Sequence, residues 1–70
     1  MRPHGIAIRD IRKGQNLGLR TLAERTGLDR GHLSRIEQGK VRNPASDTLQ
    51  RIADGLKVPV DAITRTEEKT

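Results

Sequence analysis

The chain has 70 residues, enough for one small domain stabilised by a modest core. Its 14 Lys and Arg outnumber 9 Asp and Glu, for a formal net charge of +5, and arginine suits bidentate contacts with phosphate and guanine. Cysteine is absent, which excludes disulfides and cysteine-based zinc sites. Phe, Tyr and Trp are also absent, which disfavours binding of single-stranded nucleic acid by aromatic stacking. The basic excess therefore indicates either binding to duplex DNA or simply a solvated basic surface.

The N-terminal part of the chain predicts a flexible arm followed by a helix. Residues 1–5 contain no apolar periodicity and are expected to fray. Residues 6–13 place Ile8 and Ile11 on one face of a helix, and Gly14 is expected to end it.

The next two segments predict a helix-turn-helix. Residues 19–26 carry apolar or small side chains at the i, i+3, i+4, i+7 spacing of one helical face, and Gly27 follows where a left-handed residue often closes a helix. Asp29 is a good N-cap for a helix over residues 30–38, and Gly39 is expected to close it. Two short helices joined by a three-residue turn match this motif.

The C-terminal half predicts a loop over residues 40–45, then a helix capped by Ser46 or Asp47, with Asp47 and Gln50 at capping-box spacing. The expected buried stripe of that helix is Leu49, Ile52, Ala53 and Leu56. A short fifth helix is expected near Pro59, and residues 64–70 form a polar tail of disordered composition. No strand pattern is present.

The helix over residues 30–38 is expected to bury Leu33 and Ile36 and to turn its other side to solvent. The outer side carries Gly31, Arg35 and Gln38, with Ser34 beside them and Arg30 and His32 flanking them. Gly31 costs about 1 kcal/mol of helix stability relative to alanine. Either the absent side chain lets the backbone approach a duplex closely, or a glycine is simply tolerated near the helix N-terminus.

The stretch LRTLAERTGLDRGHLSRIEQGKVRNPASDTLQRIADGLKVPVDAI resembles the Cro/C1-type (XRE) helix-turn-helix family, and the resemblance extends over residues 6–63. The matching features are Leu22-Ala23, Gly27, Leu33-Ser34-Arg35-Ile36-Glu37, Gly39, Pro44, Leu49, Ile52-Ala53 and Leu56. The resemblance implies an all-α fold, a compact five-helix bundle of the lambda-repressor-like type. It also implies that the third helix enters the major groove of DNA.

The resemblance also implies site residues. Those expected to contact bases are Arg30, Gly31, His32 and Arg35. Those expected to contact phosphate are Gly18, Leu19, Arg20, Ser34, Gln38, Lys40, Arg42 and Asn43. Arg12 and Glu37 occupy positions that form a structural ion pair in many members, and Glu37 lies beside the buried stripe, where an isolated carboxylate would be costly.

Four positions depart from the family pattern. The family usually has a side chain at the position of Gly31, so one base contact is expected to be missing there. Leu19 stands where many relatives have a glutamine that anchors phosphate, so only backbone N–H groups remain there, and Arg20 is a candidate replacement. Asn16 and Lys57 stand where glycines are common, which makes the neighbouring helix ends less certain.

These features predict a sequence-specific regulator of transcription that binds double-stranded DNA, most consistent with a repressor acting as a homodimer on paired half-sites. A patch of Val58, Val60 and Ile63 would serve dimerisation, or else close the hydrophobic core. The alternative is an antitoxin-type or accessory module that binds a partner protein. Neither a nucleophile–base pair nor a metal cluster is present, so we expect no enzyme, metal or cofactor. Apolar runs are too short to span a membrane, and a cytoplasmic location is expected.

Overall fold

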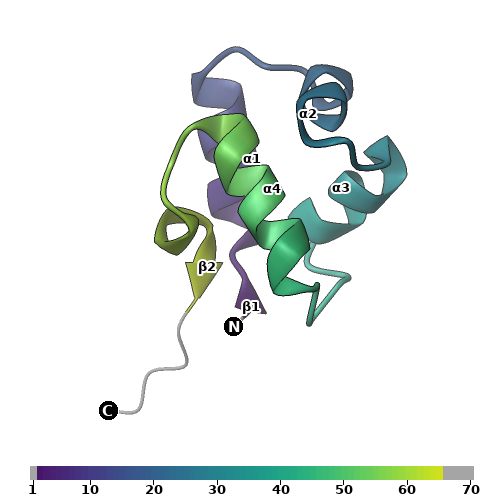
Figure 1. The fold of residues 1–70 in the computed structure, drawn as a ribbon, viewed down its shortest axis with the longest axis vertical. Coiled ribbons are helices and arrows are strands. Elements are labelled where there is room, and N and C mark those ends of the chain that lie inside the picture. The colour runs from purple at the N-terminus through teal and green to yellow at the C-terminus, as the bar shows by residue number, and fades with distance from the viewer. Residues whose placement is uncertain (1, 66–70) are drawn as a thin grey trace.

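The computed structural model describes residues 2–65; Met1 and residues 66–70, which include most of the expected polar tail, lie outside the described part. Its elements in chain order are β1 (Arg2–Pro3), α1 (Gly5–Gly14), α2 (Leu19–Thr26), α3 (Arg30–Glu37), α4 (Ser46–Leu56), the 3-10 turn η1 (Val60–Ile63) and β2 (Thr64–Arg65). Helix α4 lies in front of α1, with α2 and α3 on one side and η1 on the other (Figure 1). The lambda-repressor-like, all-helical architecture is thus present, apart from one short strand pair.

Every helix contributes to one core. The fully buried large side chains are Ile8, Leu22, Leu33, Ile36, Leu49, Ile52, Leu56 and Ile63. The apolar stripes predicted from the helical spacing are therefore confirmed in full for α3 and α4. In α1 and α2 they are confirmed in part, since Ile11 and Leu19 are only half-buried. Burying each such side chain contributes about 1.5–3 kcal/mol relative to leaving it in water. The core thus holds α3 from behind and leaves its other side for contacts with solvent or a ligand.

The prediction of a fifth α-helix was wrong. The described residues form four α-helices, and residues Val60–Ile63 form a 3-10 turn instead. Pro59 is extended at φ −69° and ψ 151°, and β2 begins at Thr64, so only four residues remain between them. So short a segment closes with an i→i+3 bond, from the N–H of Ala62 to the carbonyl of Pro59 at 2.9 Å. Ile63 is nevertheless turned inward, as expected.

A strand pair that the sequence did not predict joins the two ends of the described chain. Arg2 pairs with Arg65 and Pro3 with Thr64 in antiparallel register, and the N–H of His4 donates to the carbonyl of Ile63 at 2.8 Å. Two residues are too few for an alternating pattern to be visible, so no strand was expected. Part of the expected arm over residues 1–5 is therefore hydrogen-bonded, and α1 already begins at Gly5.

The start of α4 also differs from the expectation. Ala45 is the N-cap, and no side chain caps the helix, so neither Ser46 nor Asp47 has that role. Asp47 instead pairs with Arg51 at 3.4 Å, and Gln50 donates to Asp54 at 3.0 Å rather than closing a capping box. Asp47 and Gln50 therefore bind residues one turn further along α4 instead of the N–H groups at its start.

Two helix boundaries occur at residues in the left-handed region. Asn16, after α1, has φ +60°, and Lys57, after α4, has φ +59°. The resemblance implies glycine at both positions, and the backbone here has the conformation that glycine favours. None of the helices over residues 2–65 is long and apolar enough to cross a bilayer.

Candidate nucleic-acid interface

The turn between α2 and α3 is held by local hydrogen bonds. Gly27 adopts the left-handed conformation at φ +74° and closes α2, as the sequence predicted. The buried hydroxyl of Thr26 donates to the carbonyl of Leu22 at 3.0 Å and accepts from the N–H of Leu28 at 3.2 Å. Asp29 then caps α3 by accepting from the N–H of His32 at 3.2 Å. These contacts define where α3 begins relative to α2.

Helix α3 has one buried and one accessible side. Leu33 and Ile36 are fully buried, and Gln38 is the residue at which the helix ends. Of the four residues expected to contact bases, Arg30, Gly31 and Arg35 are exposed and His32 is half-buried. All four lie on α3, and three of them are open to solvent. Their contacts with individual bases stay a prediction.

The surroundings of Gly31 add to the two explanations given for this glycine. A Cβ atom there would lie 3.0 Å from Oδ2 of Asp29 and 3.6 Å from Nη1 of Arg35. The guanidinium of Arg35 therefore lies back over the first turn of α3, in space that a side chain at position 31 would narrow. The missing side chain leaves room for the guanidinium of Arg35.

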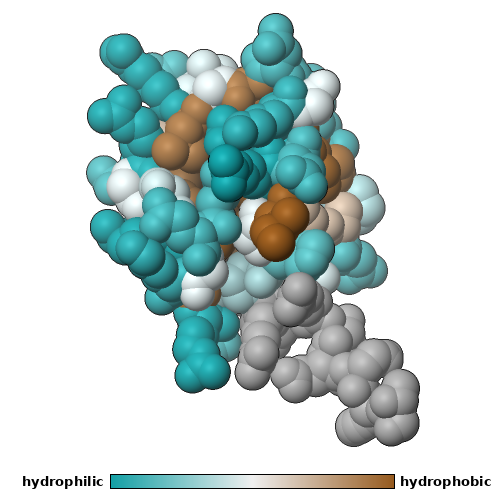
Figure 2. Space-filling view, turned by 180° about the vertical axis from the view of Figure 1, so that it is seen from behind, coloured by the Kyte–Doolittle hydropathy of each residue, from teal (hydrophilic) through white to brown (hydrophobic). Residues whose placement is uncertain are grey.

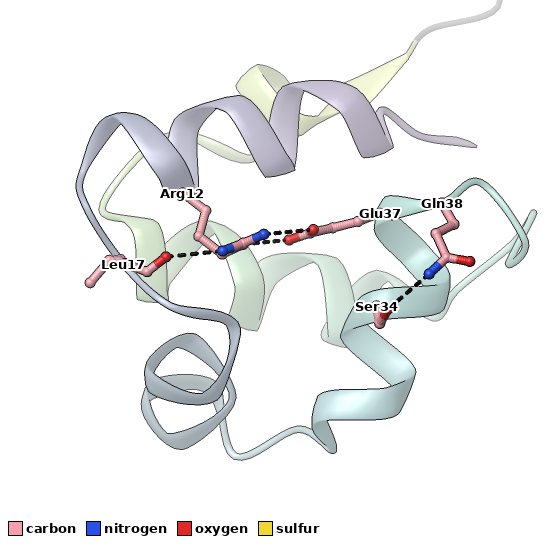
Figure 3. A network of polar contacts seen from close by, with 5 residues as sticks. All are labelled: Arg12, Leu17, Ser34, Glu37 and Gln38. Atoms are coloured by element: carbon pink, nitrogen blue, oxygen red, sulfur yellow. Dashed lines mark hydrogen bonds and ion pairs between the residues drawn. The ribbon is translucent and has the colours of Figure 1, made fainter.

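A polar network fastens α3 to α1 (Figure 3). Nε of Arg12 donates to Oε2 of Glu37 at 2.7 Å, and Nη2 donates to Oε1 at 3.0 Å, which makes the pair bidentate. Nη1 donates to the carbonyl of Leu17 at 3.0 Å. The side chains are only 11% and 7% exposed, and the hydrogen bond to Glu37 raises the pKa of Arg12 above its ordinary value. The ion pair that the resemblance implies thus joins α1, the α1–α2 loop and the end of α3.

Gly5 is a contact residue that the sequence reasoning missed. A Cβ atom at this position would lie 2.5 Å from the carbonyl oxygen of Glu37 and 2.7 Å from that of Ile36. The first turn of α1 therefore lies directly against the last carbonyls of α3, an arrangement that opposes the positive and negative ends of two helix dipoles. No local pattern marks this glycine, because its partners are some thirty residues away in the chain.

The residues expected to contact phosphate fall into two groups. Leu19, Ser34 and Gln38 line one groove beside α3, and the amide of Gln38 donates to Oγ of Ser34 at 2.9 Å. Gly18 is the N-cap residue of α2, and no side chain accepts a hydrogen bond from the first N–H groups of that helix. Arg20 is exposed, and its Nε lies 3.7 Å from Oε2 of Glu24. The exposed loop after α3 carries the second group, Lys40, Arg42 and Asn43. Phosphate binding by either group stays a prediction.

The apolar patch considered for dimerisation belongs largely to the core. Ile63 is fully buried, and Val58 and Val60 are partly buried against the core cluster. The exposed large hydrophobic side chain in the described residues is Ile6, at 65% exposure. Among residues 2–65, no group of three or more His, Cys, Asp or Glu side chains is placed to hold a metal ion.

A sequence profile of the helix-turn-helix family HTH_3 matches residues 8–63. The chain therefore belongs to this helix-turn-helix family, and the resemblance to Cro/C1-type proteins is confirmed. This membership also supports the expectation that the chain is not an enzyme.

Relatives and solved structures agree with this assignment. The uncharacterized HTH-type transcriptional regulator Rv0474 of Mycobacterium tuberculosis is 37% identical over 59 residues, covering 84% of this chain and 41% of that protein. The HTH-type transcriptional repressor RghR of Bacillus subtilis is 32% identical over 63 residues, covering 90% and 47%. The chain thus spans less than half the length of these curated relatives.

Among solved structures, the restriction-modification controller protein C.AhdI of Aeromonas hydrophila has a TM-score of 0.79 at 29% identity, covering 84% of this chain and 88% of that one. The biofilm regulator SinR, solved in complex with DNA, has a TM-score of 0.77 at 33% identity, covering 81% and 90%. The fold and the placement of the helix-turn-helix are therefore shared with a protein that was crystallised on DNA.

Proposed function

We propose that residues 6–63 form the DNA-binding unit of a transcriptional regulator and that α3 contacts bases in the major groove of duplex DNA. The observation that carries the proposal is the two-sided character of α3: its apolar side is fully buried, and its other side presents arginines, a histidine and a bare backbone position. An arginine in the major groove can contact O6 and N7 of guanine together. The solved SinR–DNA complex, which shares the fold, supports this proposal.

Two further groups bind phosphate in this proposal. The backbone N–H groups at Gly18 and Leu19, with Arg20, Ser34 and Gln38, contact one stretch of backbone, and the loop residues Lys40, Arg42 and Asn43 contact another. The N-terminus of α2 has no side-chain cap, so its N–H groups remain available to an anion. These contacts orient α3 and supply affinity that does not depend on sequence.

The regulator acts as a repressor in this proposal, binding as a homodimer to two half-sites about one helical turn apart. Support for repression comes from RghR, which is named a repressor and shares 32% identity over 63 residues. Covering promoter DNA is the simplest mode of repression for a unit that carries no catalytic group.

The first test is selection of binding sites from a random duplex library at about 150 mM salt, where long-range attraction to phosphate is largely screened. Enrichment of a motif with two-fold symmetry supports base-specific binding by a dimer. An enriched motif without symmetry supports base reading and rejects the symmetric dimer. No enrichment, with binding that disappears as salt rises, rejects sequence-specific DNA binding.

The second test separates base contacts from phosphate contacts. Arg35→Ala is expected to cost about 1–3 kcal/mol of binding free energy and to relax the preference at one base pair. Arg42→Ala is expected to weaken binding to all duplexes similarly and to reduce the salt slope by about one unit. Unchanged base preference in Arg35→Ala would overturn the assignment of the base-reading face. A changed preference in Arg42→Ala would move that residue into it.

A second function, binding of a partner protein, is supported by a solved complex of SinR with SinI, in which the SinR fold matches this chain with a TM-score of 0.77 at 33% identity. An antitoxin-type or accessory role would show as a partner that co-purifies stoichiometrically with the chain from its native cell. A partner that releases the selected duplex would place both functions on one surface. A partner that binds without affecting DNA would place them apart.

A further inference from the structure

The first turn of α3 leaves an open space at Gly31 that two oppositely charged side chains border. A Cβ atom at this glycine would lie 3.0 Å from Oδ2 of Asp29 and 3.6 Å from Nη1 of Arg35. Asp29 precedes the helix, whereas Arg35 belongs to its second turn, so the guanidinium extends back toward the start of α3. Long side chains on a helix commonly point in this direction. A carboxylate and a guanidinium thus meet over a position that has no side chain of its own.

Asp29 and Arg35 are close enough to attract each other without forming a direct ion pair. Both groups lie within 3.6 Å of one point, so their charges are less than about 7 Å apart, and opposite charges at that distance attract each other at a protein surface. Neither residue takes part in an ion pair within the described part of the chain. Both are exposed, so the guanidinium can still turn toward a ligand.

The carboxylate on the α2 wall of the adjoining groove already has a cationic partner. Glu24 lines this groove together with Asp29 and Gly31, and it lies 3.7 Å from Arg20. Seen from behind, the side of the molecule that holds α2 and α3 is covered mostly by hydrophilic side chains (Figure 2). Exposed charges are screened over about 8 Å at physiological salt, so a guanidinium here responds mainly to carboxylates beside it. The carboxylate placed beside Arg35 at the open position is that of Asp29.

The carboxylate of Asp29 is itself held in place. Its Oδ2 accepts a hydrogen bond from the N–H of His32 at 3.2 Å, which caps α3. A side chain bound to the backbone in this way provides a stationary negative charge at the start of the helix. An exposed arginine, in contrast, loses side-chain freedom when it contacts a base, and this loss weakens binding. A stationary charge that restricts the guanidinium before binding reduces the loss.

We infer that Asp29 is a positioning residue for base reading: its capping carboxylate holds the guanidinium of Arg35 over Gly31 and keeps it directed at one base pair. This inference rests on the proposed contact of Arg35 with a base, and it gives Asp29 a part in specificity besides its part in capping. Asp29 acts through Arg35 and contacts no base itself. The inference also supplies a reason for the glycine, because a side chain at position 31 would stand between the two charges.

The test is a double-mutant cycle in the 70-residue chain, measured at the base pair where Arg35→Ala relaxes the preference. Discrimination is the ratio of the affinities for the selected duplex and for a duplex with that base pair changed. Asp29→Asn removes the charge but keeps a side chain that caps helices well. It is expected to reduce discrimination about threefold to tenfold in the wild-type background and to leave it unchanged in the Arg35→Ala background. Preferences at the other base pairs are expected to stay at their wild-type values.

Glu24→Gln is the matched control, since it removes an exposed carboxylate from the other wall of the same groove. Its discrimination at the tested base pair is expected to equal that of the wild type. Asp29→Ala removes the cap as well as the charge, so it is expected to be less stable than Asp29→Asn but to discriminate equally. Circular dichroism and urea denaturation verify that each variant is folded under the binding conditions.

Wild-type discrimination in Asp29→Asn would overturn the inference and leave the proposed function intact. A loss of affinity equal for all duplexes would overturn it too, because Asp29 would then have only a structural role. An equal loss of discrimination in Glu24→Gln would attribute the effect to local charge, and a loss that persists in the Arg35→Ala background would assign it to another residue, such as Arg30; either result rejects the inference. If the wild type shows no base preference, or Arg35→Ala relaxes none, both proposals fail.

Discussion

Two helix–helix contacts, α1 with α3 and α2 with α4, each depend on a glycine but differ in what the glycine meets. At Gly5, a Cβ atom would strike the backbone carbonyls of Glu37 and Ile36 at 2.5 and 2.7 Å. At Gly55, it would strike side chains, Cγ2 of Thr26 at 2.8 Å and Cδ1 of Leu22 at 3.2 Å. Relief at Gly5 requires whole helices to move apart, because backbone carbonyls cannot move aside alone. Relief at Gly55 requires a smaller adjustment of the buried side chains of Thr26 and Leu22.

The first contact is also directional, since the bidentate pair of Arg12 and Glu37 bridges the same two helices. The second contact is an apolar packing surface, with one hydrogen bond from Arg25 to the carbonyl of Gly55 at 3.3 Å. Apolar packing tolerates small shifts better than a bidentate hydrogen-bonded pair does. We conclude that α1 sets the orientation of α3, while α4 mainly supplies the buried surface that keeps α2 folded.

The largest effect is expected from breaking the polar contact. Arg12→Ala leaves the carboxylate of Glu37 nearly buried and unpaired, and is expected to lower the free energy of unfolding by about 3 kcal/mol in urea denaturation. For so small a domain, that is a large part of the total stability. The double variant Arg12→Met/Glu37→Leu removes both charges and is expected to recover much of the loss. Equal losses in the two variants would mean that packing of the Arg12 stem, rather than the charge pair, stabilises the contact.

An intermediate effect is expected from filling the two glycine contacts. Gly5→Ala is expected to cost about 2 kcal/mol of unfolding free energy, because a methyl group would force α1 and α3 apart. Gly55→Ala is expected to cost about 1 kcal/mol: the methyl group meets the buried, hydrogen-bonded Thr26 and requires a small shift of α2, but alanine favours the interior of α4 and offsets part of that cost. Amide chemical shifts are expected to change in α3 for the first variant and in α2 for the second. A greater loss in Gly55→Ala would reverse the comparison.

The smallest effect is expected at Lys57, the left-handed residue that follows α4. Lys57 holds φ +59°, a conformation that costs an L-residue about 1 kcal/mol. Lys57→Gly is therefore expected to raise the unfolding free energy by about 0.5 kcal/mol, after the greater flexibility of glycine in the unfolded chain is allowed for. Lys57→Ala keeps the strained backbone and is the control. A gain in the alanine variant as large as in the glycine variant would assign the effect to loss of the lysine side chain.

Much of the helical structure was predictable because its signals are local. The spacing of apolar residues predicted the buried stripes, and Gly27 and Asp29 predicted the end of α2 and the start of α3. The prediction of a fifth α-helix was wrong because the segment between Pro59 and Thr64 is too short for one. The sequence did not show this length limit, because it is set by the pairing of Thr64 with Pro3. The prediction of a capping box at the start of α4 was wrong because the amide of Gln50 donates to Asp54, one turn further along the helix.

The candidate site divides in the same way. The sequence by itself determined that α3 exposes Arg30, Gly31 and Arg35, because a helix with two buried apolar residues must turn its opposite side outward. Only the tertiary structure decided that Gly5 contacts the end of α3, and that Gly55 packs against Thr26 and Leu22 of α2. Those neighbours lie more than twenty residues apart in the chain. Periodicity records which side of each helix is buried, but the meeting of two helices depends on the packing of the whole core.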